Sequence, residues 1–365
     1  MKTTYRYEPD HAIAPGETLL ETIEALDLTQ KELAQRMGRP LKTINQIIKG
    51  TAQIMPETAL QLEKVTGVPA SFWNTAEANY REALARSEEQ RHRDSQTAWV
   101  SRFSYTRMIT LQFVPDLSDK AERVEALLHF FGVVSPLQWE ATYGELCGAA
   151  RESAAYETDL GDLSAWLRAG ELRARECQCA LYDREHFLAS LRTIRNLTMK
   201  GPAEVWPEVV LLCAASGVAL ALVPELPKTH VSGFTRWLGP QKALIQLSLR
   251  YKSDDQLWFT FFHEAAHILL HGKREIFIEK RGVDSPKEQE ASQWAGDFLI
   301  PPDAWQAFIA TLPAKPTAAI IRVFAKKIGI APSIALGRLQ HREKLVSPGL
   351  FNSLKHKVEI DWTGI

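Results

Sequence analysis

"WFTFFHEAAHILLHG", residues 258–272, is the stretch from which the fold and chemistry of this chain can be approached. Each residue of a helix turns by about 100°, so His263 and His267 lie one turn apart on one face, with Glu264 beside them. Two imidazoles in this arrangement chelate one metal ion, and the carboxylate between them reaches a metal-bound water. The alternative is a buried helix that merely carries histidines. Because buried imidazoles need polar partners, a metal ion is the more efficient explanation.

A metal site of this kind needs a third protein ligand. The segment "KEQEASQWAGDFLIPP", residues 287–302, offers two carboxylates, Glu288 and Glu290. On a helix these residues differ by about 200°, so they face opposite ways and only one of them can bind the metal. The apolar residues of the segment leave the choice between them open.

Composition limits the class of protein. The chain has 365 residues, 45% of them hydrophobic and 24% charged, with a net charge of −1. This length allows two or three domains with cores of their own, and the lack of overall basicity means that any DNA-binding surface must be local. The N-terminal segment lacks the apolar core of a signal peptide, and no apolar run reaches about 18 residues. We therefore expect a cytoplasmic protein that makes no membrane contact.

The four cysteines do not form a metal-binding or disulfide pattern. None of the spacings among Cys147, Cys177, Cys179 and Cys213 matches a zinc finger. Cys177 and Cys179 make a CxC sequence rather than the CxxC of redox enzymes. We expect reduced thiols, as is usual in the cytoplasm.

Most of the chain has helical apolar spacing, and a few short β-like runs precede and follow the HEAAH helix. These runs are "GVALALV" (217–223), "GFTRWL" (233–238), "KALIQLSL" (242–249) and "EIFIE" (275–279). We predict a mainly α protein with a small sheet (α+β). Its expected parts are a domain of short helices (1–80), a helical middle region (81–200), a core that carries the HEAAH helix (201–310) and a helical C-terminal extension (311–365).

Residues 14–80 are a series of short helices with clear start and stop signals. Thr29 and Glu32 form a capping box, and Gly38 ends the helix that they open. Pro40 begins the next helix, and Gly50 follows its end. Two short helices joined by such a tight turn predict a helix-turn-helix.

The second of these helices has the composition of a DNA-reading helix. Its apolar residues Ile44, Ile47 and Ile48 pack inward. The residues expected to face the bases are Lys42, Thr43, Asn45 and Gln46. The residues expected to contact phosphates are Gln30, Arg39 and Lys49.

Residues 14–80, from "PGETLLETIEALDLTQKELAQRMG" to "VPASFW", resemble the helix-turn-helix domain of HigA-type antitoxins among the Xre-like regulators. The resemblance implies binding to operator DNA as a homodimer. It also leaves open an antitoxin that neutralises a toxin by direct contact.

The sequence HEAAHILLHG, followed by ExEAS and Leu-Ile-Pro, resembles the ImmA/IrrE metallopeptidases. The resemblance implies Zn²⁺ bound by His263, His267 and Glu288, with Glu264 as general base and Glu290 as the less favoured ligand. Ser292 stands where the family usually has Asn. We interpret His271 as a neighbour of the site rather than a ligand, and we leave the oxyanion-stabilising residue open between His230 and Tyr251.

Together the two resemblances imply a DNA-binding transcriptional regulator with a zinc-dependent endopeptidase domain. Its expected substrate is a repressor-like or antitoxin-like protein, or the chain itself. The alternatives are a transcription factor whose zinc domain senses without catalysing, and the antitoxin described above.

Overall fold

The computed structural model describes residues 13–151, 160–227, 229–248, 250, 252–273, 277–280 and 285–359. The chain divides into two compact units, Met1–Gln96 and Thr97–Ile365. Helices dominate both, and a small sheet lies in the second, which confirms the predicted fold class. The predicted boundaries at residues 80, 200 and 310 stay predictions. None of the described helices combines the length and apolar character needed to cross a membrane.

The described part of the first unit is all helical. Its elements are α1 (Pro15–Ala25), α2 (Gln30–Met37), α3 (Leu41–Ile48), α4 (Pro56–Thr66) and α5 (Ala70–Ser95). The predicted capping box at the start of α2 is confirmed: the Thr29 hydroxyl accepts from the amide of Glu32, and the Glu32 carboxylate accepts from the amide of Thr29. Gly38 ends α2 with φ of 64°, a left-handed conformation that glycine adopts without strain. The turn between α2 and α3 therefore follows from local sequence.

The core of the first unit fixes the position of α3. Ile44 and Ile47 are buried among residues of the other helices, and Ile48 is half-buried. Gly16 lets α1 approach the end of α3 closely, because a Cβ at this position would lie 2.2 Å from the carbonyl oxygen of Ile47. The polar side of α3 is thereby left on the surface.

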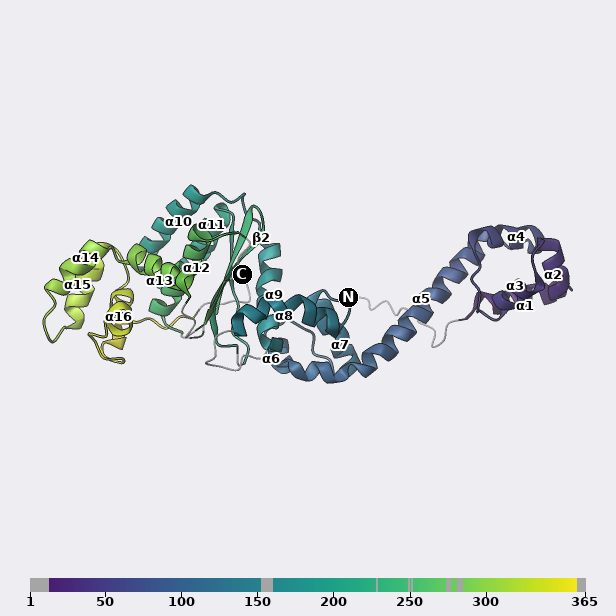
Figure 1. Cartoon of the computed structure of the whole chain (residues 1–365), viewed down its shortest axis with the longest axis horizontal. Coiled ribbons are helices and arrows are strands. Elements are labelled where there is room, and N and C mark those ends of the chain that lie inside the picture. Colours follow the sequence, from purple (N-terminus) through teal and green to yellow (C-terminus); the bar gives the residue numbers. More distant parts are fainter. Residues whose placement is uncertain are drawn as a thin grey trace. The chain divides into compact units, whose positions relative to one another are not determined.

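Where the structure describes the second unit, it contains one sheet and the remaining helices (Figure 1). Before the sheet come η1 (Thr97–Arg102), α6 (Tyr105–Thr110), α7 (Lys120–Phe131), α8 (Pro136–Arg151), α9 (Leu160–Glu176), α10 (Arg184–Leu197) and α11 (Pro202–Ala215). Then follow β1 (Val218–Leu222), β2 (Val231–Gly239), β3 (Lys242–Leu247), α12 (Asp254–Leu270), β4 (Phe277–Lys280), α13 (Pro286–Leu299), α14 (Pro302–Ala310), α15 (Ala318–Ile328), α16 (Pro332–His341) and η2 (Asn352–Leu354).

The four strands have the order β1-β3-β2-β4. β1 pairs with β3 in parallel, and β2 is antiparallel to both β3 and β4. All four lie where the sequence predicted β structure. The predicted strand 275–279 is observed as Phe277–Lys280, and residues 275 and 276 are outside the described residues.

Both faces of the sheet are buried, because side chains of a strand alternate between its two sides. Val218 and Leu220 of β1 pack with the cluster that contains α10, α11 and α12, whereas Ala219 packs with the cluster that contains α7, α8 and α9. Figure 1 shows α9 and α12 on opposite sides of the strands. The indole of Trp166 in α9 also donates to the carbonyl of Val223 at 2.8 Å. Helix α9, from the expected middle region, is thus one layer of the sheet domain.

Candidate metal centre

Helix α12 is buried almost all round. Trp258, Phe261 and Phe262 are fully buried and pack into the core beside the sheet. The polar residues of the motif are also inaccessible, with His263 1% exposed and His267 2% exposed. Polar side chains at such depth must be satisfied by partners within the fold.

Helix α13 packs closely against α12 through small side chains. Ala291 and Ala295 are fully buried, and the rings of Phe262 and Phe298 lie 5.4 Å apart. The larger side chain of Trp294 is only half-buried. The buried face of α13 is therefore centred on its alanines, because small residues let two helix backbones approach.

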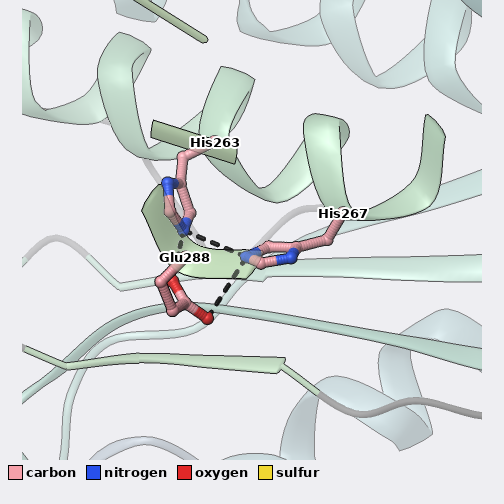
Figure 2. Close-up of side chains that lie close together, drawn as sticks. All are labelled: His263, His267 and Glu288. Carbon is pink, nitrogen blue, oxygen red and sulfur yellow. Dashed lines mark hydrogen bonds and ion pairs between the residues drawn. The ribbon is translucent and has the colours of Figure 1, made fainter. Parts of the chain in front are cut away.

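This packing brings three ligand-type side chains together. The Nε2 atom of His263 lies 2.8 Å from Oε2 of Glu288 and 3.0 Å from Nε2 of His267. Nε2 of His267 lies 3.4 Å from the other carboxylate oxygen of Glu288. Figure 2 shows the three side chains pointing toward one another. The histidines come from α12 and the glutamate from α13. Three potential ligand atoms lie within 4.8 Å of one another.

The protonation of the cluster suits metal binding. Burial raises the pKa of Glu288, but hydrogen bonds from His263 and His267 outweigh burial and hold the pKa at about 2. Burial lowers the pKa of His267 below its ordinary value. A carboxylate and a neutral imidazole are the forms that bind metal ions.

The outer nitrogens of both histidines also have partners. Nδ1 of His263 lies 3.2 Å from the hydroxyl of Ser292, and Nδ1 of His267 lies 2.9 Å from Nδ1 of His271. A metal ion would take the place of the Nε2 protons that now face Glu288, and the partners at Nδ1 would then hold the remaining ring protons, which is how metal-binding histidines are usually oriented. The donor set therefore fits a metal ion such as Zn²⁺, held by two imidazoles and one carboxylate.

His271 links the cluster to the second candidate glutamate. Nε2 of His271 lies 3.2 Å from Oε2 of Glu290, whose side chain is 60% exposed. The ring of Phe277 stacks on His267 at 3.9 Å and also contacts His271. In the described structure Glu290 is thus a partner of His271, and Glu288 is the carboxylate that reaches both motif histidines.

Replacing His271 by Ala is expected to lower zinc affinity by about 10- to 100-fold, because His267 loses the partner that orients its ring. Competition with a chromophoric chelator measures the change. His271→Asn retains an acceptor for the Nδ1 proton of His267 and should recover part of the affinity. The exposed His186 supplies a control, since His186→Ala should have no effect. Equal affinity in His271→Ala and the wild-type protein would exclude a positioning role for His271.

Glu264 lies on the sheet side of the motif. It is fully buried, and one of its carboxylate oxygens accepts a hydrogen bond of 2.6 Å from the hydroxyl of Thr235 in β2. Gly233 of the same strand packs against this carboxylate so closely that a Cβ would lie 2.3 Å from Oε1. Strand β2 therefore fixes the orientation of the Glu264 side chain.

Sequence reasoning did not identify Gly233 or Thr235 as part of the site. A signal was present, since a glycine inside a strand often marks the close approach of another group. Of the two candidates for an oxyanion stabiliser, His230 has its ring 3.1 Å from the guanidinium of Arg250. Tyr251 lies outside the described residues.

A cavity of about 780 Å³ is lined in part by residues of α12 and α13. Its lining includes Ser292, the partner of His263, and Ser232, the neighbour of Gly233. Apolar residues such as Phe259 and Ile334 share the lining with Arg338 and other polar residues. The second unit thus has space for a ligand or a peptide segment beside the motif helix.

The predicted DNA-contacting residues lie on and around α3 in the first unit. Lys42, Gln46 and Lys49 are exposed. The half-buried members of the set are Gln30, Arg39, Thr43 and Asn45. Arg39 also donates to the side-chain oxygen of Gln61 in α4 at 2.6 Å. The assignment of these residues as DNA contacts stays a prediction.

The fold and the site define a class of protein in which a helix-turn-helix unit is joined to a small-sheet domain with a HExxH helix. Residues 19–73 match the helix-turn-helix family model, and residues 222–315 match a peptidase-family model described as the IrrE N-terminal-like domain. The chain therefore carries a helix-turn-helix domain and an IrrE-like peptidase-family domain. This composition supports a DNA-binding regulator with a protease-like domain.

Solved structures similar to the chain include three antidote or antitoxin proteins. A HigA-family addiction module antidote from Coxiella burnetii is 28% identical, covers 24% of this chain and 95% of its own, and has a TM-score of 0.22. A putative plasmid maintenance antidote from Nostoc punctiforme is 22% identical, with coverages of 23% and 93% and a TM-score of 0.23. Pseudomonas aeruginosa antitoxin HigA, solved with higBA promoter, is 25% identical, with coverages of 22% and 90% and a TM-score of 0.22. No curated protein matches the chain.

Proposed function

We propose that this protein is a transcriptional regulator whose second unit is a zinc-dependent endopeptidase. The proposal rests on one observation above all. His263, His267 and Glu288 converge within 4.8 Å, on a helix pair that also carries the buried carboxylate of Glu264. A site that only holds a metal ion has no need of Glu264, whereas peptide hydrolysis needs a general base.

His263, His267 and Glu288 would hold the ion, and three protein ligands leave room for a reactant, as in catalytic rather than structural zinc sites. When bound, zinc supplies a Lewis acid that polarises the scissile carbonyl and makes water a stronger nucleophile. Glu264 takes the proton of the attacking water and passes it to the leaving amine. Thr235 and Gly233 keep the Glu264 carboxylate in one orientation during both transfers.

The expected substrate is a single protein segment rather than proteins in general. The motif helix is deeply buried, and the cavity beside it has a volume of about 780 Å³, which accommodates only a few side chains. We propose that a repressor-like or antitoxin-like protein, or a segment of the chain itself, supplies this substrate.

Peptide cleavage can be tested without knowledge of the substrate. The full chain, stripped of metal and reloaded with zinc, is incubated with a proteome-derived peptide library, and new peptide termini are identified by mass spectrometry. We expect a defined set of new termini that disappears with chelator and returns with zinc. One zinc ion per chain without any new termini, in the library or in the chain itself, would favour the non-catalytic sensor. Failure to bind zinc would contradict both.

We propose that the first unit binds operator DNA as a homodimer through α3. The support is the exposed polar side of this helix, which carries Lys42 and Gln46 and is followed by Lys49. Side chains of these types bind base edges and phosphates. The alternative is an antitoxin that neutralises a toxin by direct contact. Under this alternative, substitutions at these residues would leave toxin binding unchanged.

Replacing Lys49 by Ala is expected to weaken binding to a random-sequence duplex and to lower the slope of log K against log salt by about 1, because one phosphate contact is lost. Fluorescence anisotropy over a salt series measures the slope. Lys64→Ala is the matched control, since Lys64 is also exposed but lies on α4. A slope reduced by Lys64→Ala and not by Lys49→Ala would contradict the assignment of α3 as the DNA-reading helix.

A further inference from the structure

A pair of cysteines lies directly after α9, away from the metal cluster and unused by the proposed peptidase. The Sγ atoms of Cys177 and Cys179 are 3.6 Å apart and share a hydrogen bond. Both side chains are half-buried, so a small molecule in solvent can reach them. The two thiols face each other across a single intervening residue.

The segment that carries the two cysteines is fixed at both ends. The carbonyl oxygen of Cys177 accepts a hydrogen bond of 2.7 Å from Nζ of Lys242 in β3. The amide of Ala180 donates to the carbonyl of Ala214 at the end of α11. Because the backbone is held on both sides, the short distance between the two sulfurs is a built feature of the fold.

The surroundings favour a thiolate at one of the two sulfurs. The hydrogen bond from the Cys179 thiol lowers the pKa of Cys177, and the positive charge of Lys242 contributes in the same direction against partial burial. The same hydrogen bond, with burial, raises the pKa of Cys179. One sulfur is thus a nucleophile and its neighbour a thiol that still carries a proton.

We propose that Cys177 and Cys179 form an oxidation site at which a hydroperoxide converts the two thiols into an intrachain disulfide. The Cys177 thiolate attacks the terminal oxygen of the hydroperoxide, so that an S–O bond forms, the O–O bond breaks and a water or alcohol molecule leaves. Cys179 then attacks the sulfur of the sulfenic acid, the S–S bond forms, and the hydroxyl leaves as water with the proton of the thiol. The two cysteines lose two hydrogens, and the hydroperoxide is reduced.

Cys213 provides an internal comparison. It is fully buried, and burial raises the pKa of its thiol. A neutral and inaccessible thiol reacts slowly with both peroxides and alkylating reagents. We therefore expect oxidation at the CxC pair and none at Cys213 under the same mild conditions.

The test treats the full chain with hydrogen peroxide, blocks remaining thiols with iodoacetamide after denaturation, and maps the cysteine peptides by mass spectrometry. The expected product is a peptide in which Cys177 and Cys179 together have lost two hydrogens and take up no alkyl group, while Cys213 is fully alkylated. Dithiothreitol should restore both alkylation sites. Cys147 is read on its own peptide, so that its reaction does not affect the result.

Two variants separate the proposed disulfide from general thiol oxidation. Cys179→Ser removes the resolving thiol, so dimedone should trap a sulfenic acid at Cys177 in this variant and much less in the wild-type protein. Cys213→Ser should form the disulfide as the wild type does. Full alkylation of both cysteines after peroxide, or sulfinic acid at Cys177 beside a free Cys179, would overturn the proposal.

Discussion

Replacing Glu264 by Gln is expected to lower the rate of peptide cleavage by about 10²- to 10⁴-fold, because the amide side chain cannot accept the proton of the attacking water. Zinc content should stay at the wild-type level, since Glu264 is not among the three converging ligand-type residues. Plasma mass spectrometry measures the metal, and the yield of new peptide termini measures cleavage. A loss of activity with retained metal is the signature of a general base.

The surroundings of Glu264 make this substitution a fair test. Gln has nearly the same shape as Glu and retains an oxygen that can accept the hydrogen bond from Thr235, so the packing of β2 on α12 should persist. Gly233→Ala is a complementary variant, since it keeps the Glu264 carboxylate but the added Cβ would displace it. We expect this displacement to lower the rate of cleavage. Unchanged cleavage in Glu264→Gln would exclude Glu264 as the base, and reduced metal content would assign it to metal binding instead.

Replacing Glu288 by Gln is expected to lower zinc affinity by more than about 100-fold, a larger effect than the loss of a residue that only orients a ligand. The charged carboxylate lies 2.8 Å from His263 and 3.4 Å from His267, and its pKa of about 2 keeps it ionised. A neutral amide is a much weaker ligand for zinc. Competition with a chelator at a single pH measures the zinc affinity of the wild-type protein and of Glu288→Gln.

Glu290→Gln is the matched control for this prediction, because it makes the same chemical change two residues away on the same helix. Glu290 is largely exposed and contacts His271 rather than the motif histidines, so we expect a small change in affinity. Circular dichroism of both variants checks that α13 is intact. A large loss in Glu290→Gln combined with a small loss in Glu288→Gln would reverse the assignment of the third ligand.

Local sequence was sufficient for the elements whose boundaries depend on backbone chemistry. The capping box of Thr29 and Glu32 and the left-handed Gly38 define α2, and both are properties of a few consecutive residues. The β-like runs predicted β1, β2 and β3 because their buried strands are rich in apolar and β-branched residues.

Local sequence patterns did not predict the contacts between segments that are distant in the chain. The side chain of Thr235 and the missing side chain of Gly233 matter only because β2 lies against α12 in the folded unit. The same is true of α9, whose Trp166 bonds to a residue after β1. A helical pattern indicates that a face is buried but does not indicate what covers it.

The choice of the third ligand separates most clearly what the sequence determines from what only the tertiary structure determines. The HEAAH spacing by itself determined that His263 and His267 share one face of a helix, because helical geometry is the same in every protein. Around the helix axis, Glu290 lies at a smaller angle from Trp294 than Glu288 does. Glu288, however, lies at a smaller angle from Ala295, so helical spacing alone does not select the ligand. Only the packing of α13 on α12 decided between them: the small side chains of Ala291 and Ala295 allow the closest approach, so the face that they share with Glu288 is the one turned toward the histidines.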